Sequence, residues 1–308
     1  MPTHFSRHGV FLSMNINSLL RAYEQGVRDF PQENLQNIDF SGATFIAVNF
    51  QQANLIGSRF RRTFLTKANL EYCQLNWADL TYAKLNQANF SNADLTKANL
   101  NGAFAAKANF SGAKMSGAIL THTNCRGANL ERANLSGANL LRVNFREANL
   151  QGANLAWANL QEARLSLANL IGAKFFETDL RRAFMKDMDL SYLRLADVRL
   201  DGAKLNGSCL RGTNFSRASL RDVNFRGADL TKANLSHADL TGANFEGANL
   251  TQTMLDGAIL EGVNFSDAIS SPSLFRGVSP TVIPFQNHTD RFSRPISHLG
   301  DRQISYVS

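Results

Sequence analysis

Residues 128–160 read ANL-ERANL-SGANL-LRVNF-REANL-QGANL-AWANL. A leucine or phenylalanine ends every group of five, and this phase runs without a slip through 48 consecutive units from Phe30 to Phe265. We call this position the centre of the unit. Only four centres hold another residue, namely Ala105, Met115, Cys125 and Met185. Self-similarity at a fixed period predicts a chain built by stacking one small unit many times.

A second regular position, the small position, lies two residues before each centre. Alanine occupies 30 of the 46 small positions between Ile38 and Val263, and most replacements are slim. Each unit therefore directs two side chains inward, at alternating spacings of two and three residues. An α-helix requires apolar spacings of three and four, and a simple strand requires strict alternation, so the chain must turn every five residues.

Glycine and proline locate the turn. All 17 glycines between Phe30 and Phe265 lie two residues after a centre. Because glycine reaches positive φ without a steric penalty, this shared position predicts the corner of a tight turn. All six prolines lie outside the repeats or at their rim. That distribution is expected if the interior amides pair in β-ladders, which proline cannot join.

These A(D/N)LxG-type units, such as Ala133-Asn134-Leu135, resemble the units of the pentapeptide-repeat family, including its many cyanobacterial members. The resemblance covers roughly three quarters of the chain. It implies an all-β solenoid, namely a right-handed quadrilateral (four-sided) parallel β-helix with 20 residues per coil. Residues 29–268 would then make about twelve coils.

The flanks of the repeats lack this pattern, and four segments are predicted. They are a disordered N-terminus (1–16), a short N-terminal capping helix (17–29), the pentapeptide-repeat β-helix (30–268) and a mostly disordered proline-containing tail (269–308). Asn17 is the predicted N-cap of the helix. A cap is expected because the open end of a solenoid exposes core leucines. In the tail, Leu274 and Phe275 are candidates to cover the far end of the rod.

Charge is moderate and basic. The formal net charge of +7 divides into +4 in residues 33–268 and +3 in the flanks. Within the most basic stretch, Arg181 to Arg226, we expect the charges to point to all four sides of the rod rather than to form a basic stripe. Dispersed charge of this kind is more typical of a solvated surface than of a binding patch.

No constellation of reactive residues points to catalysis. His122 and His237 lie too far apart in coils to share a site, the carboxylates of Asp187 and Asp189 occupy outward phases, and no glycine falls in a phosphate-binding motif. The cysteines show no metal-ligand spacing, and two of the three occupy inward phases. We therefore expect no enzymatic activity, no cofactor and no metal site. Reduced thiols, together with the lack of a convincing signal peptide or transmembrane segment, favour a cytoplasmic location.

Large side chains in outward phases form the candidate interaction surface. With 20 residues per coil, Phe64, Lys84, Phe104, Phe184 and Lys204 fall in one column, and Trp77 with Trp157 fall in a second. Aromatic rings interleaved with cations can anchor a partner or stack bases. Two alternatives stay open: the ring of Phe104 turns inward to fill the space beside Ala105, or the exposed rings have no role at all.

Three successive small positions hold Met188, Leu193 and Val198 instead of alanine. The coil that contains them must widen or repack, because added volume strains a packed core. This departure has two interpretations, a swelling that marks a partner site or drift in a tolerant scaffold, and we favour drift.

The leading functional hypothesis is a non-enzymatic scaffold whose rod presents ladders of side chains to a protein partner of unknown identity. The best-understood branch of the family mimics DNA and binds DNA gyrase. Such mimicry needs a strongly negative rod, so the basic array disfavours gyrase as a partner. Binding of nucleic acid or an anionic surface fits the sign of the charge, but it is disfavoured by the expected lack of a basic stripe. The oligomeric state is left open.

Overall fold

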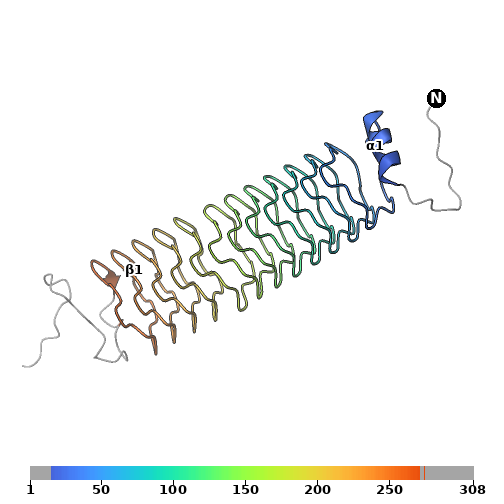
Figure 1. Ribbon diagram of the computed structural model, residues 1–308. Coiled ribbons are helices and arrows are strands. Elements are labelled where there is room, and N and C mark those ends of the chain that lie inside the picture. The colour runs from blue at the N-terminus through green and yellow to red at the C-terminus, as the bar shows by residue number, and fades with distance from the viewer. Residues whose placement is uncertain (1–14, 271–273, 275–308) are drawn as a thin grey trace, which may run out of the picture.

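In the computed structural model, residues 15–270 and residue 274 are described, and they form a long rod of stacked coils (Figure 1). Helix α1 (Ile16–Glu24) lies at one end of the rod. Strands β1 (Asn249–Leu250) and β2 (Ile269–Ser270) pair in parallel near the other end. Within this described part they are the only strands of two residues. Elsewhere each side of a coil has a single residue that forms a β-bridge to the next coil, and a turn lies on either side of it.

Every bridge joins two residues that are 20 apart, and all are parallel. Each coil of 20 residues carries four bridging positions, one per unit, so the coil has four walls. We name the walls by their columns: wall A contains Asp39 and Arg59, wall B contains Thr44 and Phe64, wall C contains Asn49 and Asn69, and wall D contains Asn54 and Gln74. The 20-residue coil is therefore confirmed, while its right-handed winding stays a prediction.

The corner between two walls requires a left-handed backbone. All 48 corner residues, two after each centre, have positive φ, and they comprise the 17 glycines and 31 other residues. Lys97, for example, has φ 59°. Its amide still donates to Ser116 O at 3.0 Å, and Ala98 N closes the turn onto Leu95 O at 2.9 Å. These bonds offset the cost of a left-handed conformation in a non-glycine residue, which is about 1–3 kcal/mol.

Some glycines also make room for the coil before them. The ring of Tyr82 lies against Gly102, so a Cβ atom added at Gly102 would collide with it, whereas a Cβ at Gly137 would meet nothing within 4 Å. Both glycines have nearly the same φ, 64° and 63°. We therefore expect Gly102→Ala to lower the free energy of unfolding by about 1 kcal/mol more than Gly137→Ala does. Denaturant melts of the two variants measure the difference, and equal values would show that the Tyr82 ring moves aside at no cost.

The core consists of the centres and the small positions, as predicted. Leu150 is fully buried, and nearly all other centres and small positions are buried as well. Serine, threonine and cysteine are tolerated at small positions because their side chains donate to the centre carbonyl 23 residues earlier. Thr123 Oγ1 donates to Leu100 O at 2.8 Å, and Cys73 Sγ reaches Phe50 O at 2.8 Å. A buried polar group with a hydrogen bond of this kind avoids its desolvation cost.

Helix α1 differs from the predicted boundaries. It begins at Ile16, and its N-cap is Asn15, whose side chain accepts from Ser18 N at 2.9 Å. Asn17 is not the cap because it already lies inside the helix, and the helix ends at Glu24 rather than near residue 29.

Helix α1 packs on the first coil. Leu19 is buried in the core, and the Tyr23 ring meets Phe45 edge-on with centroids 5.2 Å apart. At the other end Leu274 is also buried.

The prediction of disorder is wrong for Asn15 and Ile16, which start α1, and for Ile269 and Ser270, which form β2. The disorder predicted for residues 1–14 and for most of the tail, and the predicted role of Phe275, fall outside the described residues.

Candidate functional site

All five residues of the first predicted column, that of Phe64, lie on wall B. The bridges Phe64↔Lys84 and Lys84↔Phe104 place three of its residues in register, and Phe184↔Lys204 follows four coils further on. The three rings are 43%, 40% and 46% exposed. Phe104 therefore points outward, and the alternative that it turns inward beside the buried Ala105 is wrong.

Lysine and phenylalanine contact each other within this column. Lys84 Nζ lies 3.3 Å from the centroid of the Phe104 ring, in a cation–π arrangement. The ammonium group covers one face of the ring, so that face is not available for a stacked base unless Lys84 moves. The contact also orders a long side chain that would otherwise be free to rotate.

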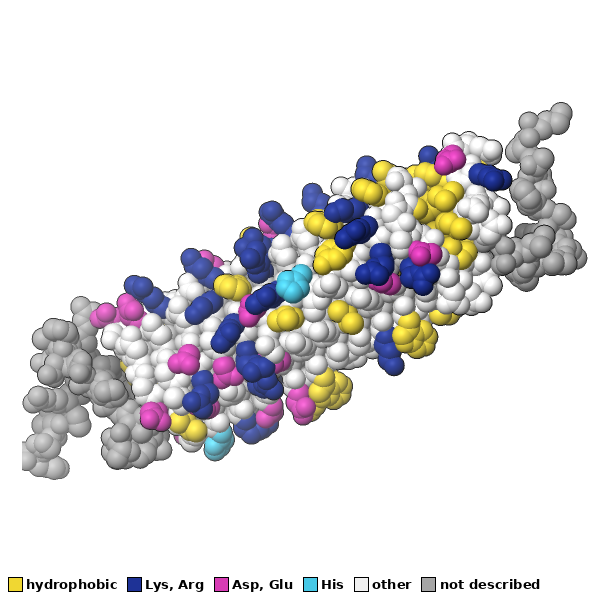
Figure 2. Space-filling view, viewed as in Figure 1, with side chains coloured by type: hydrophobic (Ala, Val, Ile, Leu, Met, Phe, Trp, Pro, Cys, Tyr) yellow, Lys and Arg dark blue, Asp and Glu magenta, His cyan; other side chains and the backbone are white. Residues whose placement is uncertain are grey.

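Positive charge gathers on wall B. Together with the turn residues at its two corners, wall B carries 15 Lys and Arg against eight Asp and Glu. Counted in the same way, walls A, C and D have net charges of −1, 0 and +2. The ten cations of Arg181–Arg226 reach all four sides, as predicted: six lie on wall B or its corners, and the same count gives five for wall A and three each for walls C and D, since each corner belongs to two walls. Figure 2 shows how Lys and Arg side chains follow the length of the rod, with hydrophobic side chains between them.

The acidic residues of this wall are partly neutralised within it. Arg126 pairs with Glu147 at 2.6 Å and Arg142 pairs with Glu162 at 2.7 Å. The hydrogen bond from each guanidinium lowers the pKa of its carboxyl partner. Eight of the 15 cations form no ion pair within the described part of the chain: Arg62, Lys67, Lys84, Lys107, Arg146, Arg164, Arg182 and Lys204.

The second predicted column is not a joint site. Trp77 and Trp157 occupy the same corner, between walls D and A, but four coils separate them, which corresponds to roughly 19 Å. Trp157 instead contacts Phe176 edge-on, with ring centroids 5.4 Å apart. The sequence analysis did not pair Trp157 with Phe176. Their spacing of 19 residues, which places them on neighbouring coils at one corner, could have predicted this contact.

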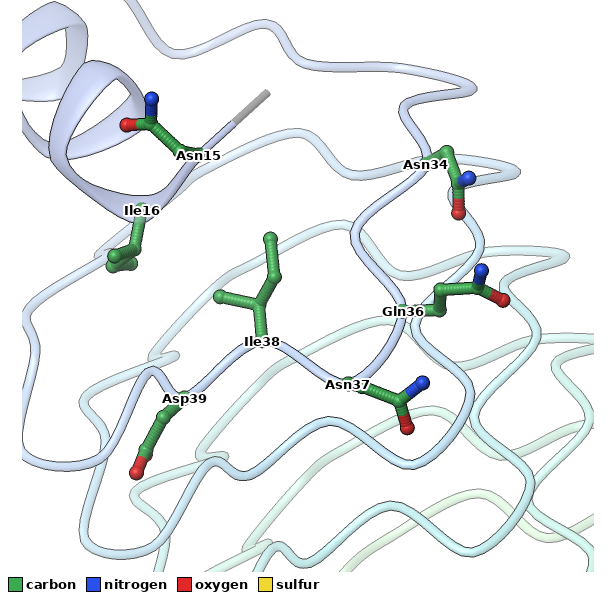
Figure 3. Close-up of a pocket in the computed structure, with 7 residues that line it drawn as sticks. All are labelled: Asn15, Ile16, Asn34, Gln36, Asn37, Ile38 and Asp39. Carbon is green, nitrogen blue, oxygen red and sulfur yellow. The ribbon is translucent and has the colours of Figure 1, made fainter. Parts of the chain in front are cut away.

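A pocket of about 460 Å³ lies between α1 and the first coil (Figure 3). Its lining includes Ile16 from the helix, Ile38 from the coil and several side-chain amides, with Asp39 as its one titratable residue. None of the residues that line this pocket belongs to the predicted columns.

The other candidate groups lie apart from one another. His122 and His237 are exposed at different corners, and the side chains of Asp187 and Asp189 lie on the surface. Among residues 15–270 and 274, no three His, Cys, Asp or Glu side chains are arranged to hold a metal ion. Helix α1 is too short to cross a membrane, and the described residues form no other helix.

The cysteines differ in accessibility. Cys73 and Cys125 are buried, and burial raises the pKa of each thiol to about 12. Cys209 is partly exposed on wall C. Because the thiolate is the reactive form, we expect a thiol reagent at neutral pH to modify one cysteine of the folded protein and all three after unfolding. Rapid modification of two or three thiols in the folded state would contradict this burial.

The coils and their ladders define the class of this protein, a parallel β-helical repeat protein. The family model for pentapeptide repeats matches residues 34–71, 73–112 and further overlapping stretches that end at residue 267. The chain therefore belongs to the pentapeptide-repeat family.

Several relatives are similar in sequence or structure. The uncharacterized protein slr1152 of Synechocystis sp. is 73% identical over 45 residues, which are 15% of this chain and 14% of that protein. HetL, a pentapeptide-repeat protein involved in heterocyst differentiation regulation in the cyanobacterium Nostoc sp., is 32% identical, with 83% of this chain and 94% of HetL covered and a TM-score of 0.30. QnrB1, a plasmid-mediated fluoroquinolone resistance protein, is 20% identical, with 75% and 93% covered and a TM-score of 0.35.

Proposed function

We propose that this protein is a non-enzymatic scaffold that binds an acidic surface of a partner protein through wall B. The observation that carries the proposal is the excess of positive charge on this wall, interleaved with three half-exposed phenylalanines. Eight of its cations form no ion pair with another described residue. Aromatic and arginine side chains tend to dominate interface energies, and complementary charge speeds association. In this proposal the rod is a right-handed β-helix of about twelve coils.

Nucleic acid is the second candidate because a basic, aromatic-bearing wall also suits a phosphate backbone. Two features favour a protein. Lys84 covers a face of the Phe104 ring, and the Phe184 and Phe104 rings are four coils apart rather than placed as a continuous stacking platform. DNA gyrase is disfavoured as a partner, since a DNA mimic requires negative charge where this wall is positive.

The test reverses three charges in one column and compares two walls. Lys84→Glu/Arg164→Glu/Lys204→Glu changes wall B, and Lys114→Glu/Lys174→Glu/Arg194→Glu makes the same change in the wall D column. Proteins that copurify with each variant at physiological salt are compared by mass spectrometry. The proposal predicts an acidic protein that is retained by the wild type and the wall D variant but lost by the wall B variant.

A single-stranded oligonucleotide serves as the second probe. Binding that depends on wall B and weakens steeply with salt would replace the proposal by the nucleic-acid candidate. Denaturant melts of both triple variants show whether a loss reflects the surface or the stability of the rod. Identical partners for both variants would contradict any role of wall B.

A further inference from the structure

The backbone ladder is interrupted between two successive coils in the second half of the rod. We call the coil that contains residues 165–180 the lower coil and the following one, with residues 185–200, the upper coil. On walls C and D, five backbone amides of the lower coil have no backbone acceptor among the described residues: Leu167, Leu170, Gly172, Phe175 and Glu177. The five matching amides one coil earlier all donate, at 2.8 to 3.1 Å. The bridges expected at Asn169–Asp189 and Lys174–Arg194 are missing from the same walls of this described region.

Walls A and B remain closed across the same boundary. Leu180 N donates to Arg199 O at 2.7 Å on wall A, and Leu165 N donates to Phe184 O at 2.9 Å on wall B. The bridge Arg164↔Phe184 is also present. The two coils are therefore joined on two adjacent walls and separated on the other two, in the manner of a wedge.

Core volume accounts for the position of the wedge. Met188 is the small-position residue of wall C and Leu193 that of wall D in the upper coil, and both are buried. Each adds several heavy atoms where alanine is usual, and an overfilled core is relieved by a backbone shift. Val198, on wall A, adds less volume, and its wall keeps the bond from Arg199 N to Thr178 O, though at a longer 3.2 Å.

Side chains at the surface weaken the same boundary. The asparagine ladder of wall C extends to Asn169, and the next residue in its column is Asp189, which has no amide to donate. On wall D, Lys174 of the lower coil faces Arg194 of the upper coil. Two like charges in this position destabilise the contact between the coils. At the corner between these walls, Ile171 and Tyr192 are 68% and 77% exposed.

We propose that this boundary is a hinge that divides the rod into two rigid blocks, with walls A and B as its axis. In a solenoid the coupling between repeats is a nearest-neighbour term, so the interface that lacks ladder bonds is where the stack bends. Opening the wedge on walls C and D turns walls A and B toward the inside of the bend. Because Arg164 and Phe184 lie on opposite sides of the hinge, the bend changes the curvature of wall B. The hinge stands on backbone geometry and does not depend on what wall B binds.

Hydrogen exchange tests the open ladder directly. In the full-length protein, we expect the amides of residues 167–177 that face the wedge to exchange about 100-fold or more faster than their bonded counterparts in residues 147–157. Peptides that cover the two segments give the rates by mass spectrometry. Equal protection of the two segments would overturn the proposal.

Variants test the cause. Met188→Ala/Leu193→Ala should let the ladder close and slow exchange at residues 167–177, while Val198→Ala should leave those rates unchanged. Unchanged exchange in a double variant that keeps the wild-type circular dichroism would overturn the assignment of the wedge to these two side chains.

Distances test the motion without altering the wedge. Gln32, Arg132 and Lys232 occupy the same corner at intervals of 100 residues, so the two pairs span equal numbers of coils, and only the second pair spans the wedge. Spin labels are placed at Gln32→Cys with Arg132→Cys, and at Arg132→Cys with Lys232→Cys, in a Cys209→Ser background. We expect a broader and longer distance distribution for the second pair. Equal widths for the two pairs would overturn the hinge.

Discussion

Leu150→Asp is expected to lower the free energy of unfolding by about 5 kcal/mol or more, enough to prevent folding of the surrounding coils. Leu150 is a fully buried centre in the middle of the rod, and its amide donates to Asn169 O at 2.8 Å. An aspartate there would place a carboxylate among leucine and alanine side chains that offer it no hydrogen bond. Because each coil rests on its neighbours, the defect would also weaken the interfaces above and below.

The matched control is Gln151→Asp, one residue further along the chain. Gln151 is exposed, so we expect its replacement to change the free energy of unfolding by less than about 0.5 kcal/mol. Denaturant melts of the two variants measure both values. Similar losses would mean that the inward and outward phases are assigned incorrectly.

Asn109→Ala is expected to cost roughly 2–4 kcal/mol. On wall C, asparagines at intervals of 20 residues form a side-chain ladder from Asn49 to Asn169. Asn109 Nδ2 donates to Asn89 at 3.0 Å, and its Oδ1 accepts from Asn129 Nδ2 at 3.2 Å and from Ser111 N at 3.1 Å. Removal of all three bonds leaves partners unpaired, at about 0.5–1.5 kcal/mol for each bond.

Asn139 on wall A provides the control for this ladder. It occupies the same phase, but its side chain makes one hydrogen bond within the described residues, accepted from Leu141 N at 3.3 Å. Asn139→Ala should therefore cost about 1 kcal/mol. Thermal or denaturant unfolding compares the two variants, and an equal cost would show that the ladder bonds add nothing beyond the local turn.

Helix α1 shows where local signals were ambiguous. Asn15 and Asn17 both precede the apolar residues Leu19 and Tyr23, and both residue types are good N-caps. Asn15 is the cap because the helix begins two residues earlier than predicted, with Ile16 packed against the core. The start of the helix is set by its packing on the first coil, and this information is absent from the local sequence.

The repeat by itself determined the inward residues, the corner at every fifth residue and the column on wall B, because these features depend only on a period that the chain states many times. The tertiary structure decided how the four walls differ from one another in charge and in their hydrogen bonds. Charges from distant residues add up on wall B only once the coils are stacked, since a count along the chain mixes all four walls. In the same way, Met188 and Leu193 stood out as bulky, but a wedge follows from how one coil rests on the next, which depends on volumes and bonds across 20 residues.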